Sequence, residues 1–192
     1  MKKTVLITGS NSGLGKYLVE KFEKEGNTVI KHLGSKHFDL SKINNVESLA
    51  SEARSMGVDV LVNNAAITCP NKRFEFYDND EIHRMISVNL TAPIILTHML
   101  LDQLTDVINI NSMVGLEVKA NRTLYSATKW GLRGFSQSLK VEKDSLNVLD
   151  VYPTNIQTTS DRTNAMNVYY VVDCIYDSYT RRDRELVLDG RK

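Results

Sequence analysis

A tyrosine and a lysine four residues apart are the side chains of this sequence best suited to acid–base chemistry. They are Tyr125 and Lys129, in the segment YSATK. Side chains four residues apart lie on one face of a helix, so the ammonium group and the phenol would be neighbours. A nearby positive charge favours the phenolate and lowers the pKa of a tyrosine, which suits proton transfer near neutral pH. The same spacing also occurs on ordinary exposed helix faces, so the pair alone does not define a site.

A glycine-rich segment near the start of the chain could bind a phosphate group. The segment TGSNSGLG, residues 8–15, follows an apolar stretch and precedes a helical pattern. Glycines allow the backbone to approach a pyrophosphate closely, and the following helix directs its N-terminus at the negative charge. The spacing is Gly-x-x-x-Gly-x-Gly, which differs from the commonest dinucleotide fingerprint. The alternative is an ordinary strand-to-helix turn that uses glycine for a positive φ angle.

The order of five motifs resembles that of the short-chain dehydrogenase/reductase family. That family has a Thr-Gly-x-x-x-Gly-x-Gly turn, an Asn-Asn-Ala-Gly motif, an Asn in the next helix, a Ser at the end of the fifth strand, and Tyr-x-x-x-Lys. This chain matches them with TGSNSGLG at 8–15, NNAA at 63–66, Asn89, Ser112, and Tyr125 with Lys129. The resemblance extends from Thr4 to Gly190, which is nearly the whole chain.

The resemblance implies a role for each of four candidate catalytic residues. Tyr125 would give a proton to a carbonyl oxygen during reduction, or remove one from an alcohol during oxidation. Lys129 would bind the ribose of the nicotinamide and favour the phenolate. Ser112 would hydrogen-bond the substrate oxygen, and Asn89 would hold a water that connects Lys129 to solvent. Taken as single residues, Ser112 could also cap the end of a strand and Asn89 could bridge packed segments.

The resemblance also implies that NADP or NAD binds along the ends of the strands. The residues expected to bind the cofactor are Gly9, Ser10, Asn11, Ser12, Gly13, Leu14, Gly15, Lys31, Ser35, Asp39, Leu40, Asn63, Asn64, Ala65, Tyr125, Lys129, Pro153 and Thr158. No metal site is expected.

The residues after the second strand favour NADP over NAD. An acidic residue there would bind the ribose 2′-hydroxyl and repel a 2′-phosphate. The chain has Lys31, Ser35 and Lys36 instead, and cations and a hydroxyl favour a phosphate. Asp39 with Leu40 matches the family's pair at the end of the third strand, where the Asp contacts the adenine. If Asp39 reaches the ribose instead, NAD would be preferred.

Three departures from the family pattern affect the expected site. Ala66 stands in place of the last glycine of the Asn-Asn-Ala-Gly motif, and Thr154 in place of a glycine after Pro153. The segment from Ile156 to Met166, where the family has a lid over the substrate, is short. An open site would suit a bulky substrate, and it would equally suit a protein that binds a cofactor without turnover.

The elements that must position these residues alternate between strands and helices. We expect strands at residues 4–7, 29–30, 58–62, 107–110, 148–151 and 186–188, with a further candidate near His37 and Phe38. We expect helices at residues 14–22, 46–54, 80–100, 124–140 and 167–179. Only seven residues separate Ile30 from Phe38, too few for a helical crossover, so a helix after the second strand is missing. The predicted fold is α/β, a Rossmann-like doubly wound parallel sheet in a single domain over residues 1–192.

Composition excludes several other classes of protein. The 192 residues carry 24 Lys and Arg against 23 Asp and Glu, a net charge of +1. This balance gives no electrostatic attraction to nucleic acid or to an anionic membrane. No apolar run reaches the roughly 18 residues of a membrane-spanning helix. The two cysteines make no disulfide framework, and the opening MKKTVLITGS is a first strand and not an export signal, so we expect a cytoplasmic protein.

The sequence therefore predicts a nicotinamide-dependent oxidoreductase that acts on a small carbonyl or alcohol substrate. The alternative is a non-catalytic NAD(P)-binding sensor or regulator on the same fold. A sugar-nucleotide epimerase or dehydratase is disfavoured, because little chain follows Pro153 to form a substrate domain. By resemblance, we expect a homodimer or homotetramer that assembles through the helices predicted at 80–100 and 124–140.

Overall fold

Six parallel strands form the sheet that carries the site. The computed structural model describes residues 2–68, 71–158 and 164–191. The strand order is β2-β1-β3-β4-β5-β8, with every neighbouring pair parallel. The strands are β1 (Thr4–Ile7), β2 (Thr28–Lys31), β3 (Val60–Asn63), β4 (Asp106–Ile110), β5 (Asn147–Pro153) and β8 (Glu185–Leu188). Their carboxyl ends lie at one edge of the sheet, where the predicted motifs follow β1, β3, β4 and β5.

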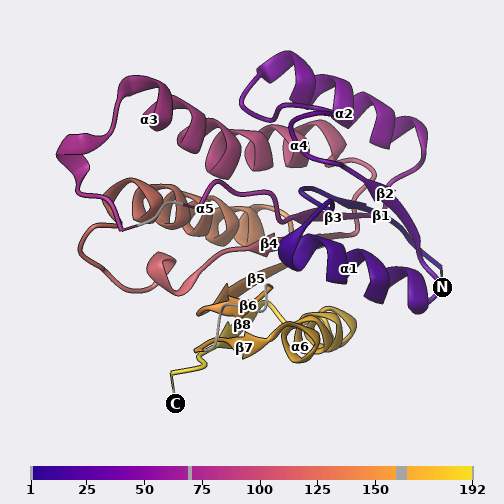
Figure 1. Ribbon diagram of the computed structural model, residues 1–192. Helices are drawn as coiled ribbons and strands as arrows, with labels where there is room; N and C mark the ends of the chain where they lie inside the picture. Colours follow the sequence, from indigo (N-terminus) through magenta and orange to yellow (C-terminus); the bar gives the residue numbers. More distant parts are fainter. Residues whose placement is uncertain (1, 69–70, 159–163, 192) are drawn as a thin grey trace.

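Helices cover both faces of the sheet, as the doubly wound prediction requires (Figure 1). The first face carries α1 (Gly13–Lys24) and α6 (Val168–Arg181), which pack together against the strands. The other face carries α2 (Ile43–Ser55), α4 (Ala92–Leu100) and α5 (Thr123–Glu142). The fold class predicted from the alternation of strands and helices is confirmed.

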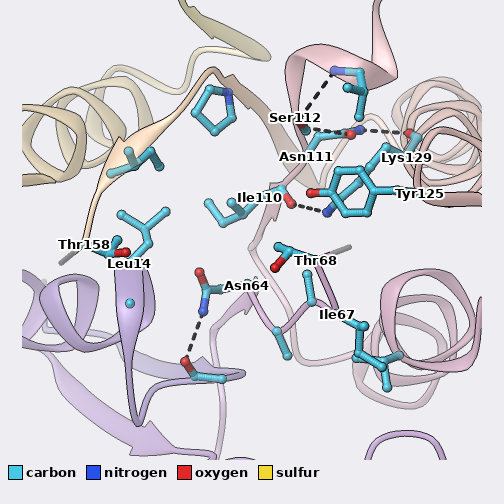
Figure 2. Close-up of a pocket in the computed structure, with 18 of the residues that line it drawn as sticks. Leu14, Asn64, Ile67, Thr68, Ile110, Asn111, Ser112, Tyr125, Lys129 and Thr158 are labelled. Atoms are coloured by element: carbon cyan, nitrogen blue, oxygen red, sulfur yellow. Dashed lines mark hydrogen bonds between the residues drawn. The ribbon is translucent and has the colours of Figure 1, made fainter. Parts of the chain in front are cut away.

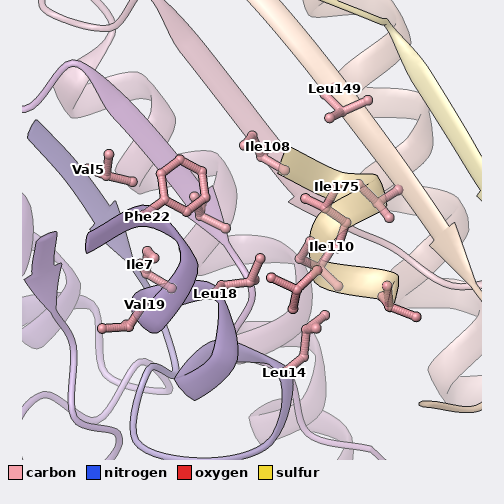
Figure 3. Close-up of a cluster of buried hydrophobic side chains, with 14 of the residues drawn as sticks. Val5, Ile7, Leu14, Leu18, Val19, Phe22, Ile108, Ile110, Leu149 and Ile175 are labelled. Carbon is pink, nitrogen blue, oxygen red and sulfur yellow. The ribbon is translucent and has the colours of Figure 1, made fainter. Parts of the chain in front are cut away.

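The core under α1 and α6 explains why α1 forms where the spacing predicts it. Leu14, Leu18 and Phe22 recur every four residues and are all buried against the strands. Figure 3 shows these side chains facing Val5 and Ile7 of β1, with Ile175 of α6 beside them. Strands buried on both faces read as continuous apolar runs, which is the pattern of residues 4–7.

A row of polar side chains crosses the opposite face of the sheet. Asn63, Asn109 and Asp150 are in register on adjacent strands. The Asn63 amide donates to Asn109 Oδ1 at 2.9 Å. Asp150, which is fully buried, accepts from Lys140 Nζ of α5 at 2.7 Å, and Lys140 also donates to the Arg184 carbonyl at 2.7 Å. This buried ion pair fixes α5 against β5 and the start of β8.

The helix predicted over residues 80–100 forms with an interruption. It consists of α3 (Asn79–Ile86), a π-helical segment η2 (Ser87–Thr91) and α4. Asp78 and Glu81 form a capping box at its start. The wider turn of a π segment is often found at functional sites, and here it contains Asn89.

The connection from β2 to α2 contains no strand or helix over residues 32–42, all of which are described. The predicted absence of a helix there is confirmed, whereas the strand suggested near His37 and Phe38 is wrong. Those two residues form a turn closed on the Gly34 carbonyl. Asp39 and Leu40 therefore do not end a third strand, because the chain passes directly from β2 into the turn before α2.

The shortened lid segment begins and ends in a small parallel pairing. Strand β6 (Ile156–Gln157) pairs with β7 (Met166–Asn167), and residues 159–163 between them lie outside the described residues, as does Cys69. Two short 3-10 helices, η1 (Phe74–Phe76) and η3 (Met113–Gly115), complete the elements.

Two observations bear on the other sequence predictions. Within the described ranges, no helix is both long enough and apolar enough to cross a bilayer. Ile86 on α3 and Trp130 on α5 are exposed, so the helices expected at a subunit interface present apolar side chains to solvent. The assembly itself stays a prediction.

Candidate active site

A cavity of about 1380 Å³ runs along the carboxyl ends of the strands. Its walls come from the glycine turn after β1, the loop after β2, the ends of β3, β4 and β5, and the first turns of α5. Figure 2 shows Leu14 and Thr158 near one side of this space and Tyr125 and Lys129 near the other. Residues from the predicted catalytic and cofactor motifs meet in this cavity.

Two of the three glycines in the turn are packed too tightly for a larger residue. Gly9 has φ +65°, and a Cβ atom there would lie 2.9 Å from the Ala65 Cα. A Cβ at Gly15 would overlap the Gly9 carbonyl oxygen. Thr8 fixes the turn to the end of β3, because its Oγ accepts the backbone N–H groups of Asn64 and Ala65 at 3.0 Å each.

The N-terminus of α1 opens toward the cavity without a side-chain cap. Ser12 is the N-cap residue and makes no capping hydrogen bond in the described structure, and the first turn of α1 contains no acidic residue. Ser12, Gly13 and Leu14 all line the cavity. Free N–H groups and the positive end of a helix dipole bind anions, so this turn fits a pyrophosphate.

Lys129 is buried beside Tyr125 on α5. The lysine is 2% exposed, and its Nζ donates to the Ile110 carbonyl at 2.8 Å. Nζ lies 5.6 Å from the centroid of the Tyr125 ring. Burial lowers the pKa of Lys129 to about 8, so the ammonium form still predominates at neutral pH. Figure 2 shows the Tyr125 hydroxyl directed into the cavity.

Ser112 stands immediately after β4, on the wall next to Tyr125. Its Oγ accepts the Val114 N–H at 3.4 Å, which leaves its own hydrogen to donate. Asn111 supports this segment from below: its Oδ1 accepts the Ser112 N–H at 3.0 Å, and its Nδ2 donates to the Lys129 carbonyl at 3.2 Å. Ser112 therefore caps the short helix η3 and also lines the cavity.

Asn89 is buried and does not line the cavity. Its Oδ1 accepts the Ile67 N–H at 2.7 Å, and its Nδ2 donates to the Ile67 carbonyl at 2.9 Å and to Thr128 Oγ at 3.3 Å. Thr128 Oγ donates in turn to the Tyr125 carbonyl at 2.8 Å. The side chain thus bridges the loop after β3 to the helix that carries Tyr125.

The far end of the cavity carries one carboxylate and one guanidinium group among the described residues. Asp39 Oδ1 accepts both the backbone N–H and the hydroxyl of Ser41, and these bonds lower the pKa of Asp39 below its usual range. The charge of Arg84, from α3, lowers it further. Ser35 and Arg84 both line the cavity.

Lys31 lies elsewhere than the sequence suggested. Side chains alternate along a strand, and Ile30 packs into the core on the α2 face. Lys31 consequently points to the α1 face, where Nζ lies 2.8 Å from a carboxylate oxygen of Glu23. It does not line the cavity, and neither does Lys36.

Most of the residues predicted for the site lie together. Those that line the cavity are Gly9, Ser12, Gly13, Leu14, Ser35, Asp39, Leu40, Asn64, Ala65, Ser112, Tyr125, Lys129, Pro153 and Thr158. Those that do not are Ser10, Asn11, Gly15, Lys31, Asn63 and Asn89. Three residues of the second group pack behind the lining residues: Gly15, Asn63 and Asn89.

The lining residues that the sequence analysis did not predict include His32, Arg84 and Asn111. Asn111 directly precedes Ser112, so its position at the end of a strand was a usable signal. Arg84 comes from a helix that no cofactor motif marks, and the partners of His32 are defined only by the fold. In the described ranges, no cluster of His, Cys, Asp and Glu could hold a metal ion.

Comparison with known proteins identifies relatives of this arrangement. A family model described as short chain dehydrogenase matches residues 31–167. The chain is 31% identical over 191 residues to the 3-oxoacyl-(acyl-carrier-protein) reductase FabG of Vibrio harveyi, covering 86% of this chain and 77% of that protein.

Solved structures share the fold. A short-chain dehydrogenase from Streptomyces avermitilis has a TM-score of 0.88 at 23% identity, covering 99% of this chain and 89% of its own. A short-chain dehydrogenase from Sphingobium yanoikuyae in complex with NADPH has a TM-score of 0.85 at 22% identity, covering 96% and 87%.

Proposed function

The chain belongs to the short-chain dehydrogenase family, and from this membership we propose that it transfers a hydride between NAD(P) and a carbonyl or alcohol substrate. The observation that carries the proposal is the buried Lys129 ammonium beside Tyr125 on a cavity that continues to an uncapped glycine turn. Burying a charged lysine is unfavourable, so its presence beside Tyr125 points to a function.

Tyr125 acts as the general acid in reduction and as the general base in oxidation. The ammonium group of Lys129 stabilises the phenolate that remains when Tyr125 gives up its proton. Ser112 donates its free hydrogen to the substrate oxygen and holds it near the phenol. These roles need only side chains that already face the cavity.

The residues present fit a nicotinamide dinucleotide. The start of α1, which has no side-chain cap at Ser12, suits the pyrophosphate, and the tight packing at Gly9 and Gly15 holds this turn against the residues after β3. When bound, the dinucleotide supplies or accepts the hydride, while the protein contributes position and electrostatics. The bound NADPH in the Sphingobium yanoikuyae relative agrees with this fit.

The preference for NADP now rests on fewer residues. Lys31 pairs with Glu23 away from the cavity, so Ser35 and Arg84 are left to attract a 2′-phosphate at the end that also holds Asp39. Because the carboxylate and the guanidinium group offset one another, we propose a modest preference for NADP.

Replacing Tyr125 by Phe tests the proposed chemistry. Tyr125→Phe should reduce turnover of a carbonyl substrate by at least about 100-fold, the usual minimum for a lost general acid. The dissociation constant of NADPH should stay within about threefold, because the ring and its packing remain. Stopped-flow oxidation of NADPH and fluorescence titration measure the two quantities on the same preparations.

Thr123→Ala, at the first position of the same helix and exposed, serves as the control and should leave turnover unchanged. Full activity in Tyr125→Phe would reject the proton-transfer role. Tight NADPH binding with no turnover of any carbonyl or alcohol tested would favour the alternative, a cofactor-binding sensor.

A further inference from the structure

His32 connects the glycine turn to the shortened loop after β2. It follows the last residue of β2 and is 2% exposed. Its Nδ1 accepts the Gly9 N–H at 3.0 Å, and its Nε2 lies 2.8 Å from the Phe38 carbonyl oxygen. Gly9, His32 and Phe38 all line the cavity. One imidazole ring therefore joins two walls of the expected cofactor site.

The partners of the ring define its protonation state. A backbone N–H can only donate, so Nδ1 must be the acceptor; a carbonyl oxygen can only accept, so Nε2 must carry the hydrogen. Only one neutral tautomer meets both requirements. A second proton at Nδ1 would place two N–H groups opposite one another and break the bond to Gly9.

The backbone around His32 makes the turn depend on this position. Ser10 donates to the His32 carbonyl through both its N–H and its Oγ, at 3.0 Å each. The His32 N–H donates to the Ile7 carbonyl at 3.2 Å. These bonds survive substitution of the side chain, so a variant at position 32 should perturb the turn without unfolding β1.

We propose that His32 is a positioning residue of the dinucleotide site, which holds Gly9 and Phe38 in place of the missing crossover helix and releases Gly9 when it is protonated. The inference rests on the proposed function, since it concerns binding of the same dinucleotide. His32 itself offers the cofactor no hydrogen bond, because both ring nitrogens are occupied.

The charges near the ring favour the neutral form. Burial lowers the pKa of His32, and the neighbouring His37, whose ring centroid lies 6.4 Å away, lowers it further; the Phe38 and Gly34 carbonyls act in the opposite direction. On the side of the glycine turn, the ring contacts the uncharged backbone N–H of Gly9.

The other charged side chains near the ring lie on neighbouring elements or form ion pairs of their own. Asp39 on the loop and Arg84 on α3 line the same cavity, and Lys31 pairs with Glu23. The ring is therefore neutral at pH 7 and above, and affinity for the dinucleotide should fall as the pH drops below the pKa of His32.

The test is the affinity for ADP-ribose between about pH 5.5 and 8, measured by isothermal titration calorimetry. ADP-ribose carries the pyrophosphate and adenosine but neither a titrating 2′-phosphate nor an acid-labile dihydronicotinamide. In the wild-type protein, affinity should fall up to about tenfold per pH unit below the pKa of His32.

Two substitutions test the hydrogen bonds to Gly9 and to Phe38 separately. In His32→Asn, the amide oxygen replaces Nδ1 as the acceptor for Gly9 without titrating, so affinity at pH 7.5 should stay within about threefold and lose its acid dependence. In His32→Gln, the amide reaches Phe38 but leaves the Gly9 N–H without an acceptor, so affinity should fall about tenfold at every pH. His37→Asn, at the exposed neighbouring ring, is the matched control: it should bind like the wild type at pH 7.5 and keep the acid dependence, shifted to higher pH because His37 no longer lowers the pKa of His32.

The acid dependence persisting in His32→Asn, or wild-type affinity in His32→Gln, would overturn the role of His32 while leaving the proposed function intact. Absence of ADP-ribose and NADH binding to the wild type at pH 7.5 would instead refute the proposed function, and this inference with it. Urea unfolding midpoints at pH 5.5 and 7.5 show whether each variant is folded during the titration.

Discussion

Single residues in this site act through the partners that the fold gives them. Ser112, Tyr125 and Lys129, which the sequence motifs single out, line one cavity, because their spacing follows the strand ends and one helix face. Lys31 was misjudged, because a lone cation near a strand end does not reveal which face it occupies. His32 was missed for a related reason: an imidazole has no recognisable role until the two groups that flank it are known.

Replacing Lys129 by Met should make the folded protein more stable and the enzyme inactive. Burial lowers the pKa of Lys129 from 10.5 to about 8, which corresponds to about 3 kcal/mol at about 1.4 kcal/mol per pH unit. Loss of the donor to the Ile110 carbonyl costs about 1 kcal/mol, so Lys129→Met should gain about 2 kcal/mol at pH 7. Urea unfolding measures this gain.

The lowered pKa of Lys129 also predicts how the stability of the wild type changes with pH. Between about pH 8 and 10.5, Lys129 binds a proton in the unfolded chain but not in the folded one, so wild-type stability should rise with pH in this range. The advantage of Lys129→Met should shrink accordingly. Lys16→Met, at an exposed lysine, is the control, and a loss of stability in Lys129→Met at pH 7 would contradict the argument.

At the scale of elements, periodicity predicted every helix of the two layers and the six long strands. It could not predict the π segment around Asn89, because an extra residue in a turn leaves the apolar pattern almost unchanged. The pairing of β6 with β7 also escaped it, since two-residue strands carry no period. The missing crossover helix was predictable because chain length limits what a connection can contain.

The buried pair on α5 and β5 should be a strong determinant of stability. Lys140→Met leaves the Asp150 carboxylate buried without its counter-ion, at a cost of about 3–5 kcal/mol at pH 7. Burial already raises the pKa of Asp150, and removing the lysine raises it further. The folded variant therefore binds a proton more readily than the unfolded chain, so its deficit should shrink as the pH falls.

Urea unfolding of Lys140→Met at pH 7 and pH 5 measures this deficit. Lys143→Met, at an exposed lysine just beyond the same helix, should change stability by less than about 0.5 kcal/mol. An equal deficit for the two variants would show that the ion pair contributes little.

At the scale of the whole molecule, a large cavity borders the short connection after β2. The glycine turn, the strand ends and α5 still converge on it, and His32 and Arg84 occupy positions near its trimmed end. The missing crossover helix thus alters the wall expected around an adenosine and leaves the arrangement of Tyr125 and Lys129 intact. Sequence motifs predict the intact part well, because each motif is local; the altered wall depends on residues from β2 and α3 that meet only after folding.

A parallel titration of the purified protein with NADPH and with NADH, followed by the fluorescence of the reduced nicotinamide, tests the central claim most directly. We expect saturable binding of both at one site per chain, with NADPH favoured by less than about tenfold, because Asp39 offsets Arg84. Absence of binding by either dinucleotide would show that the trimmed cavity no longer accepts a nicotinamide cofactor, and would contradict the proposed oxidoreductase.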